Sequence, residues 1–267
     1  MVSIPFVKAH GARNDFLLTW RGALPPEVSD FSALAVALCH RHAGVGADGW
    51  ILLSPSPFAA AAIELWNSDG SLSELSGNGA RCAAALLVES GRAREQLAIA
   101  TGAGIKSLTL LERRALSFVF EMNMGPVRIE ESHSSIVVGH ESVILNVGNP
   151  QCAVFVSGFD FDWRALGAKL ERHPRFPNRT NVSFVHVIDR HTLDVRFFER
   201  GAGVTQSSGT GSAGAAAAAL ARGWVEDPVK VLTPAGPLNL RWRSGDILLA
   251  GPAEIAARGE FCWNAAE

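Results

Sequence analysis

The stretch Ser76-Gly77-Asn78-Gly79-Ala80-Arg81-Cys82 decides how this sequence folds, because a second stretch, Ser208-Gly209-Thr210-Gly211-Ser212-Ala213-Gly214, repeats its pattern. Each is a Ser-Gly-x-Gly turn that leads into an alanine-rich segment with high helix propensity. The sequence therefore predicts two helices that begin at glycine-rich turns. The first backbone N–H groups of such helices have no acceptor within the helix, so they favour anion binding at the positive end of the helix dipole.

The residues upstream of the two turns indicate an internal repeat. A polar residue stands nine positions before each serine, Asn67 in the first half and Glu199 in the second. Both residues close an apolar run, 62–66 and 193–198, that is typical of a strand. Each half therefore has the predicted order strand, loop, glycine turn and helix, which favours two related units.

The other apolar runs extend this plan to the whole chain. Turns at 11–15 and 148–151 place Asn14 and Asn149 at equivalent positions, and a Pro-broken loop covers 173–181. We expect an α/β (α+β) protein with mostly antiparallel sheets and a boundary at Gly125, which gives domains 1–125 and 126–267. The predicted helices are 31–42 and 161–170, and the further predicted strands are 4–10, 16–20, 50–53, 97–100, 105–111, 115–122, 142–147, 182–188, 229–232, 238–242 and 247–251.

The composition favours a soluble protein with a small-molecule partner. The chain has 267 residues, 48% of them hydrophobic, which is enough for a sizeable core. Its net charge is −2, from 24 basic and 26 acidic residues, so we expect no basic surface for nucleic acid or an anionic membrane. The sequence shows no signal peptide and no apolar run of membrane-spanning length. These features predict a cytoplasmic protein.

The four cysteines, Cys39, Cys82, Cys152 and Cys262, do not favour a metal site. They are far apart in the sequence and form no Cys-x-x-Cys pair, so neither a zinc nor an iron–sulfur site is expected. Cys82 lies in an alanine-rich segment and Cys152 in a strand-like run, where a buried cysteine acts as a small hydrophobic residue. None of the four stands in the position of a nucleophile.

Several motifs together resemble those of the diaminopimelate epimerase family, and they extend over nearly the whole chain. They are Gly11–Phe16, Asn67-Ser68-Asp69-Gly70, Gly77–Cys82, Asn149-Pro150, Glu199-Arg200-Gly201-Ala202-Gly203 and Gly209-Thr210-Gly211. The resemblance implies two α/β domains related by a pseudo-twofold axis. Each domain is a sheet wrapped around a central helix, and the active site lies in the cleft between the domains. We also expect a homodimer.

The same resemblance implies an epimerase that inverts the α-carbon of an amino acid with two cysteines and without pyridoxal phosphate or a metal. LL-/meso-diaminopimelate, an intermediate of lysine biosynthesis, is the leading substrate. Ser76 and Ser208 stand at the two cysteine positions and are expected to face each other across the cleft. The positions that match substrate-binding residues of the family are Asn14, Asn67, Asn149, Asn181, Glu199 and Arg200 for the amino and carboxylate groups, and Gly77, Asn78, Gly209 and Thr210 for the amides that hold the α-carboxylate.

Two of these residues have charges that suit an amino acid. Arg200 is expected to bind a carboxylate through its planar guanidinium, and Glu199 to bind an ammonium group. They follow an apolar strand and precede the flexible run Gly201-Ala202-Gly203.

This sequence departs from the family pattern at four positions. A hydroxyl is a far weaker acid than a thiol, so Ser76 and Ser208 need a separate base, or each serves only to cap its helix. Gln151 stands where the family usually has a histidine, and Val204 where it has a glutamate. Three functions therefore remain open. They are an amino-acid epimerase, a dehydratase or other isomerase of the same fold, and a catalytically silent protein that binds an amino acid.

Overall fold

The computed structural model of the protein describes residues 1–264, which form two compact units. Unit 1 comprises Met1–Met122 and the described residues from Gly251 onward, and unit 2 comprises Asn123–Ala250. The chain passes from unit 1 to unit 2 within strand β8 (Ser117–Pro126) and returns within strand β17 (Asp246–Trp263).

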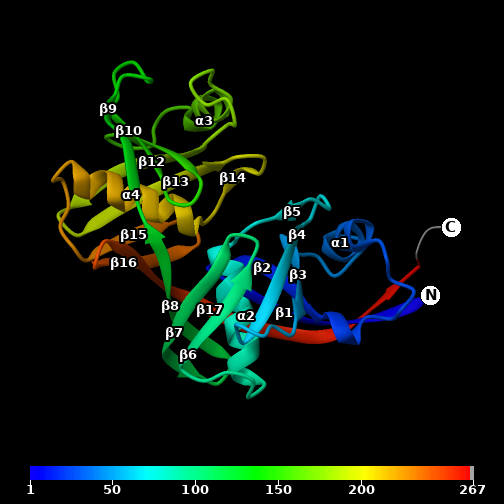
Figure 1. Cartoon of the computed structure of the whole chain (residues 1–267). Helices are drawn as coiled ribbons and strands as arrows, with labels where there is room; N and C mark the ends of the chain where they lie inside the picture. The colour runs from blue at the N-terminus through cyan, green and yellow to red at the C-terminus, as the bar shows by residue number, and fades with distance from the viewer. Residues whose placement is uncertain (265–267) are drawn as a thin grey trace. The chain divides into compact units, whose positions relative to one another are not determined.

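The two halves of the chain have the same order of elements, which agrees with the internal repeat inferred from the sequence (Figure 1). The first half consists of β1 (Val2–Gly11), β2 (Asn14–Trp20), α1 (Phe31–Cys39), β3 (Gly49–Ser54), β4 (Ala61–Asn67), β5 (Leu72–Ser73), α2 (Gly77–Glu89), β6 (Gln96–Thr101), β7 (Gly104–Arg114) and β8. The second consists of β10 (Ser142–Asn146), β11 (Pro150–Phe155), α3 (Trp163–Glu171), β12 (Asn181–Asp189), β13 (Thr192–Glu199), β14 (Gly203–Thr205), α4 (Gly209–Ala221), β15 (Val229–Thr233), β16 (Gly236–Arg243) and β17. The 3-10 helix η1 (Arg21–Ala23) and strand β9 (Arg128–Ser134) lie outside this repeat.

The strands of unit 1 close into a barrel. Neighbouring strands follow the order β1, β2, β3, β4, β6, β7, β8 and β17, and β17 pairs with β1 again. The pairs β2–β3 and β4–β6 of this ring are parallel, and the pairs β1–β2, β3–β4, β6–β7, β7–β8 and β1–β17 are antiparallel. The strands surround α2, which contacts β1, β2, β3 and β6.

Unit 2 repeats this arrangement around α4. Its strands are paired in the order β9, β10, β11, β12, β13, β15, β16 and β17, with β11–β12 and β13–β15 parallel. Helix α4 contacts β9, β10, β11, β12, β13, β15 and β16. The predicted fold class, mostly antiparallel sheets wrapped around central helices, is therefore confirmed.

The composition of α2 and α4 explains why they lie inside the sheets. All residues from Gly77 to Val88 in α2 are buried, and so is the run from Gly211 to Ala219 in α4. A helix that is apolar on all sides must be covered all round, and its alanines and glycines let the strands approach closely. The other two helices cover outer faces, where Phe31 of α1 contacts Trp50 and Trp66, and Trp163 of α3 contacts Phe184.

The main difference from the sequence-based plan concerns the C-terminal strand. The sequence predicts a strand over 247–251 and assigns residues 126–267 to the second half, of which 265–267 lie outside the described residues. In the structure β17 continues to Trp263, and its pairing with β1 runs from Val2 opposite Trp263 to His10 opposite Glu254. The described residues after Ala250 therefore belong to unit 1.

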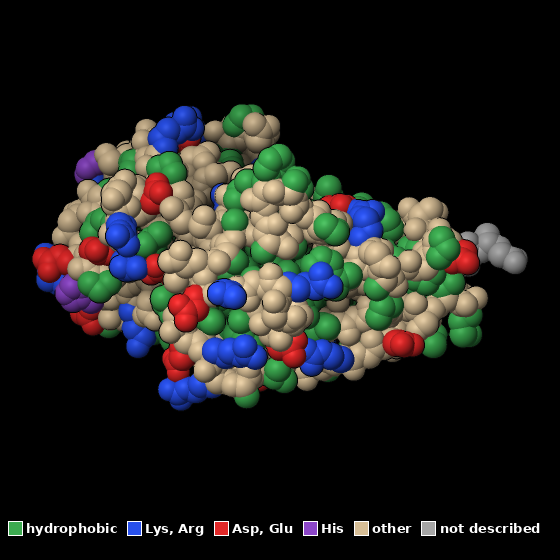
Figure 2. All heavy atoms as spheres, turned by 60° about the horizontal axis from the view of Figure 1, so that its bottom comes forward, with side chains coloured by type: hydrophobic (Ala, Val, Ile, Leu, Met, Phe, Trp, Pro, Cys, Tyr) green, Lys and Arg blue, Asp and Glu red, His purple; other side chains and the backbone are tan. Residues whose placement is uncertain are grey.

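Charged side chains of both signs lie on the surface (Figure 2). On the face in Figure 2, Lys and Arg side chains lie beside Asp and Glu side chains. Exposed ion pairs include Arg128 with Glu130 and Arg175 with Glu131. Within residues 1–264, no helix is both long enough and apolar enough to cross a membrane.

The close packing of α4 gives a first prediction. Ala216 is 0% exposed, whereas Ala221 on the same helix is exposed. Ala216→Leu adds a side chain where the strands leave no room, so we expect it to lower the free energy of unfolding by about 1–3 kcal/mol. Ala221→Leu should change it by less than about 0.5 kcal/mol. Urea denaturation of both variants tests this, and equal effects would show that α4 is not enclosed.

Candidate active site

The first predicted site residues lie at the N-terminus of α2. Ser76 is the N-cap residue, and its Oγ accepts a hydrogen bond from Gly79 N at 3.1 Å. Gly77 and Asn78 are buried, and their N–H groups have no acceptor within the helix because they belong to its first turn. A Cβ at Gly79 would lie 3.1 Å from Ile51 Cδ1. The glycine thus lets strand β3 pack directly against the start of the helix.

The N-terminus of α4 has the same geometry. Ser208 is the N-cap residue, and its Oγ accepts a hydrogen bond from Gly211 N at 3.1 Å. A Cβ at Gly211 would lie 2.8 Å from Phe197 Cδ1, so glycine is required there by the close approach of β13. Both serines therefore cap their helices, which is one of the two roles considered from the sequence.

A hydrogen-bond network connects the start of α2 to Asn14. Asn78 donates through Nδ2 to Asn14 Oδ1 at 3.2 Å. Asn78 Oδ1 accepts from Arg81, which is 0% exposed and also donates through Nε to Pro252 O at 3.1 Å. Burial lowers the pKa of Arg81 to about 10, so its guanidinium remains charged at neutral pH. The buried cation thereby fixes the side chain of Asn78.

Asn14 in turn contacts a group of charged residues. Its Nδ2 donates to Asp48 Oδ2 at 2.7 Å, and Arg41 bonds to both Asp48 and Asp15. Burial by itself raises the pKa of Asp15, but hydrogen bonds from Arg41 and Lys8 outweigh this effect, and the pKa is lowered. The sequence predicts that Asn14 lies within a five-residue turn. The structure instead has a tight hairpin, with positive φ at Ala12 and Arg13, and Asn14 begins β2.

The side chain of Asn67 forms its hydrogen bond within its own turn. Its Nδ2 donates to Ser71 Oγ at 2.9 Å, and Ser71 Oγ donates to Asp69 Oδ1 at 2.6 Å. The side chain of Asn67 therefore stabilises its own turn at the end of β4.

Glu199, the residue of the second half at the same offset, does contact its serine. Glu199 Oε2 accepts from Ser208 Oγ at 2.7 Å, and Oε1 accepts from Thr205 Oγ1 at 2.6 Å. Burial raises the pKa of Glu199, and the two hydroxyl donors reduce this shift without cancelling it. A carboxylate, two hydroxyl groups and the start of α4 thus form one hydrogen-bonded group.

The remaining predicted amide side chains of unit 2, those of Asn149 and Asn181, are fixed by hydrogen bonds. Asn149 donates through Nδ2 to Thr210 Oγ1 at 3.3 Å and accepts at Oδ1 from Gln151 Nε2 at 2.7 Å. Asn181 accepts at Oδ1 from Arg200 N at 3.0 Å and donates through Nδ2 to Pro150 O at 3.0 Å.

The side chain of Arg200 contacts a neighbouring loop, and the side chain of Val204 is exposed. Arg200 is exposed, and its Nη1 donates to Asn178 O at 3.2 Å in the loop before β12. Val204 is 47% exposed. The carboxylate of Glu199 and the guanidinium of Arg200 therefore have different partners, although the two residues are adjacent.

Four residues that support the site carry no individual role in the sequence analysis. Thr205 donates a hydrogen bond to Glu199, and Arg81 donates one to Asn78. Asp48 accepts a hydrogen bond from Asn14, and Glu171 accepts one from the backbone N–H of Gly201, next to Arg200. Glu171 is a 2% exposed carboxylate that also pairs with Arg179 and Arg172. Of these four, only Arg81 could have been identified from the sequence. It is a charged residue in an otherwise apolar helix, and such a residue must find polar partners.

The cysteines are not reactive groups of this site. Burial raises the pKa of Cys39, Cys82 and Cys152 to about 12 in each case. Cys82 and Cys152 are buried, as the sequence predicts, and Cys262 is exposed. Within residues 1–264, no group of three His, Cys, Asp or Glu side chains is arranged to hold a metal ion.

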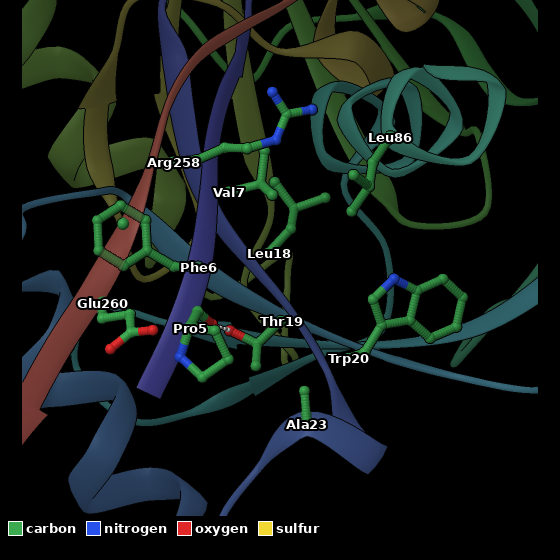
Figure 3. Close-up of a pocket in the computed structure, with 11 residues that line it drawn as sticks. Pro5, Phe6, Val7, Leu18, Thr19, Trp20, Ala23, Leu86, Arg258 and Glu260 are labelled. Carbon is green, nitrogen blue, oxygen red and sulfur yellow. Dashed lines mark hydrogen bonds between the residues drawn. The ribbon is translucent and has the colours of Figure 1, made fainter. Parts of the chain in front are cut away.

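A groove of about 460 Å³ lies elsewhere on unit 1 (Figure 3). Phe6, Leu18 and Trp20 form much of its wall, Arg258 and Glu260 lie along β17, and Thr19 Oγ1 donates to Pro5 O at 2.9 Å. None of its lining residues belongs to the predicted site.

Comparison with solved structures defines the fold class. A PhzF-family phenazine biosynthesis protein of Bacillus anthracis superposes with a TM-score of 0.75, 16% identity and coverage of 97% of this chain and 99% of that chain. A hydroxyproline epimerase of Agrobacterium vitis, solved with trans-4-hydroxy-L-proline, gives a TM-score of 0.70, 17% identity and coverage of 97% and 92%. The fold is thus one shared by amino-acid epimerases and PhzF-type proteins.

Sequence comparison identifies the family. The family model for diaminopimelate epimerase matches residues 6–130 and 143–255. A diaminopimelate epimerase of Pelotomaculum thermopropionicum is 37% identical and one of Moorella thermoacetica is 38% identical; each alignment covers 96% of this chain and 98% of the relative. The chain belongs to the diaminopimelate epimerase family.

The charge network around Asn14 predicts a pH-dependent contribution to stability. Because the folded pKa of Asp15 is lowered, its ion pairs stabilise the fold above the unfolded pKa of about 3.9 and are lost as the pH falls through the folded pKa. We expect Asp15→Asn to cost about 1–3 kcal/mol at pH 7 and the difference from the native protein to disappear in acid. Urea denaturation between pH 3 and 7 measures it, with exposed Asp160→Asn as control, and a pH-independent difference would contradict the ion-pair role.

Proposed function

We propose that this protein is a cofactor-independent amino-acid epimerase, and that it interconverts LL- and meso-diaminopimelate in lysine biosynthesis. Membership of the family supports the reaction class. The observation that carries the proposal is the pair of serine-capped, glycine-rich helix starts, each with free backbone amides. That both serines act on one substrate molecule is part of the proposal.

The amides of Gly77, Asn78, Gly209 and Thr210 bind the α-carboxylate in this proposal. Removal of the α-proton moves negative charge toward that carboxylate. Backbone N–H groups and the positive ends of α2 and α4 stabilise this charge without reorganisation. Asn14, Asn67, Asn149, Asn181 and Arg200 bind the polar groups of the diamino acid.

The two serines limit the rate. A hydroxyl is a far poorer proton carrier than a thiol at neutral pH, while the residues proposed to bind the substrate are all present in the sequence. We therefore expect the protein to bind a diamino acid and to exchange its α-proton slowly.

Restoring thiols tests the reaction class. Ser76→Cys combined with Ser208→Cys should raise α-deuterium exchange and epimerisation of LL-diaminopimelate by roughly 10²–10⁴-fold, the usual contribution of a general acid or base. The assay is nuclear magnetic resonance in heavy water. Ser90→Cys, at the other end of α2, is the matched control and should have no effect. If neither the native protein nor the double variant exchanges the proton, the epimerase proposal is wrong.

A binding measurement tests the role of Arg200. Arg200→Ala removes a guanidinium that can pair with a carboxylate, so diaminopimelate affinity in calorimetry should fall by more than tenfold, as expected for loss of a charged hydrogen bond. Arg190→Ala is the control, because Arg190 lies beyond the opposite end of β13 and pairs with Glu226. Unchanged affinity of Arg200→Ala would remove Arg200 from the site.

We further propose that the protein acts in the cytoplasm as a homodimer and uses neither pyridoxal phosphate nor a metal. The resemblance of its motifs to the family supports these points. Activity should survive treatment with EDTA and with hydroxylamine, and sedimentation should give twice the mass of the chain. Loss of activity with either reagent would contradict the cofactor-independent reaction.

A further inference from the structure

Helix α3 contacts the candidate site through one of its faces. Gly167 and Glu171 lie one helical turn apart and are both buried, on the side of α3 that packs on β12 and β13 (Figure 1). A Cβ at Gly167 would lie 2.8 Å from Phe198 Cβ. One turn later, Glu171 Oε1 accepts a hydrogen bond from Gly201 N at 3.2 Å. The helix therefore contacts the residues on both sides of the dipeptide Glu199-Arg200.

The carboxylate of Glu171 is buried and fully paired. It forms an ion pair with Arg179 through Oε1, and its Oε2 accepts from Arg172 Nε at 3.2 Å. Burial by itself raises the pKa of Glu171, but hydrogen bonds from Arg179 and Gly201 outweigh this effect, and the pKa is lowered. A buried carboxylate is costly unless it is paired and hydrogen-bonded. The positions of Arg179 and Gly201 are therefore tied to that of the carboxylate.

Arg179 belongs to the loop between α3 and β12, and this loop contacts Arg200. The φ of Arg179 is 62°, a conformation that costs free energy in a residue other than glycine, so its ion pair with Glu171 stabilises the loop there. The carbonyl of the preceding residue, Asn178, accepts from Arg200 Nη1 at 3.2 Å. Asn181, two residues after Arg179, accepts from Arg200 N at 3.0 Å. The loop thus binds both the backbone and the guanidinium of Arg200.

We propose that Glu171 is a positioning residue, which holds the guanidinium of Arg200 where it can bind a carboxylate of the substrate. Glu171 acts through two contacts, one with Gly201 in the turn after β13 and one with Arg179 in the loop before β12. This inference rests on the proposed function, and it assigns Glu171 no contact with the ligand.

The exposure of the Arg200 side chain is the reason why such support matters. A mobile arginine loses rotamer entropy when a ligand orders it, and this loss reduces affinity. A turn and a loop that are already fixed make the loss smaller. Removal of the Glu171 carboxylate takes this partner from both Gly201 N and Arg179. We expect the guanidinium of Arg200 then to occupy several positions in the free protein.

A double-mutant cycle on ligand affinity tests the inference. Binding of meso-diaminopimelate is measured by calorimetry for Glu171→Ala, Arg200→Ala and the combined variant. Glu171→Ala should weaken binding by roughly tenfold in the native background and by less than about twofold in the Arg200→Ala background, because Glu171 acts through Arg200. Equal weakening in both backgrounds would reveal a general structural effect and would overturn the inference.

Two further variants control for folding and for charge. Glu171→Gln keeps an oxygen that can accept from Gly201 N but loses the ion pair, so its effect should be smaller than that of Glu171→Ala. It also takes the place of Glu171→Ala in the cycle if that variant folds poorly. Glu131→Gln is the matched control, because Glu131 pairs at the surface with Arg175 of the same loop. Loss of this surface pair should leave the affinity unchanged.

Hydrogen exchange of the Gly201 amide tests the contact without a ligand. This N–H donates to Glu171 in the native protein, so Glu171→Ala should speed its exchange by roughly tenfold or more. The amides of Val185 and Val195, which lie opposite each other in β12 and β13, should keep their rates. A change at all three amides would indicate general destabilisation and would contradict a local role.

The outcomes separate this inference from the proposed function. Unchanged affinity of Glu171→Ala, or an unchanged exchange rate at Gly201, would overturn the positioning role while the epimerase proposal stands. Unchanged affinity of Arg200→Ala would have the same consequence. No binding of diaminopimelate by the native protein would overturn both.

Discussion

Burial of two alanine-rich helices is the constraint on which the rest of this structure depends. Because α2 and α4 are buried all round, sheets must surround them, and glycines at 79 and 211 admit the strands at closest approach. The start of each helix nevertheless carries N–H groups that no helical carbonyl can satisfy. The fold therefore places two electropositive backbone ends beside polar side chains, and this is the basis of the proposed carboxylate binding.

The two halves share their framework and differ in their chemistry. The order of elements and the serine caps are the same, yet Glu199 contacts Ser208 whereas Asn67 is engaged by Ser71. This difference bears on the chemistry of the two serines, because a hydroxyl needs a base nearby to carry a proton.

Much of the framework could be predicted from the sequence, because glycine turns, alanine-rich helices and alternating strands depend on local patterns. The return of β17 to β1 could not, since residues 254–263 pair with a strand about 250 positions away and have no distinct local signal. The motifs identify the candidate residues, but they do not predict which groups those residues contact. The sequence does not predict that Asn67 stabilises its own turn whereas Glu199 binds a capping serine. Thr205 reaches Glu199 only because β14 folds back on β13.

Backbone amide resonances of the two helix starts offer the most direct test of carboxylate binding at these positions. In a titration of isotopically labelled protein with meso-diaminopimelate, the signals of Gly77, Asn78, Gly209 and Thr210 should shift and saturate together. 1,5-Diaminopentane, which has the amines without the carboxylates, should leave them unchanged. Shifts confined to the groove of Phe6 and Trp20, or equal shifts with both ligands, would contradict carboxylate binding by α2 and α4.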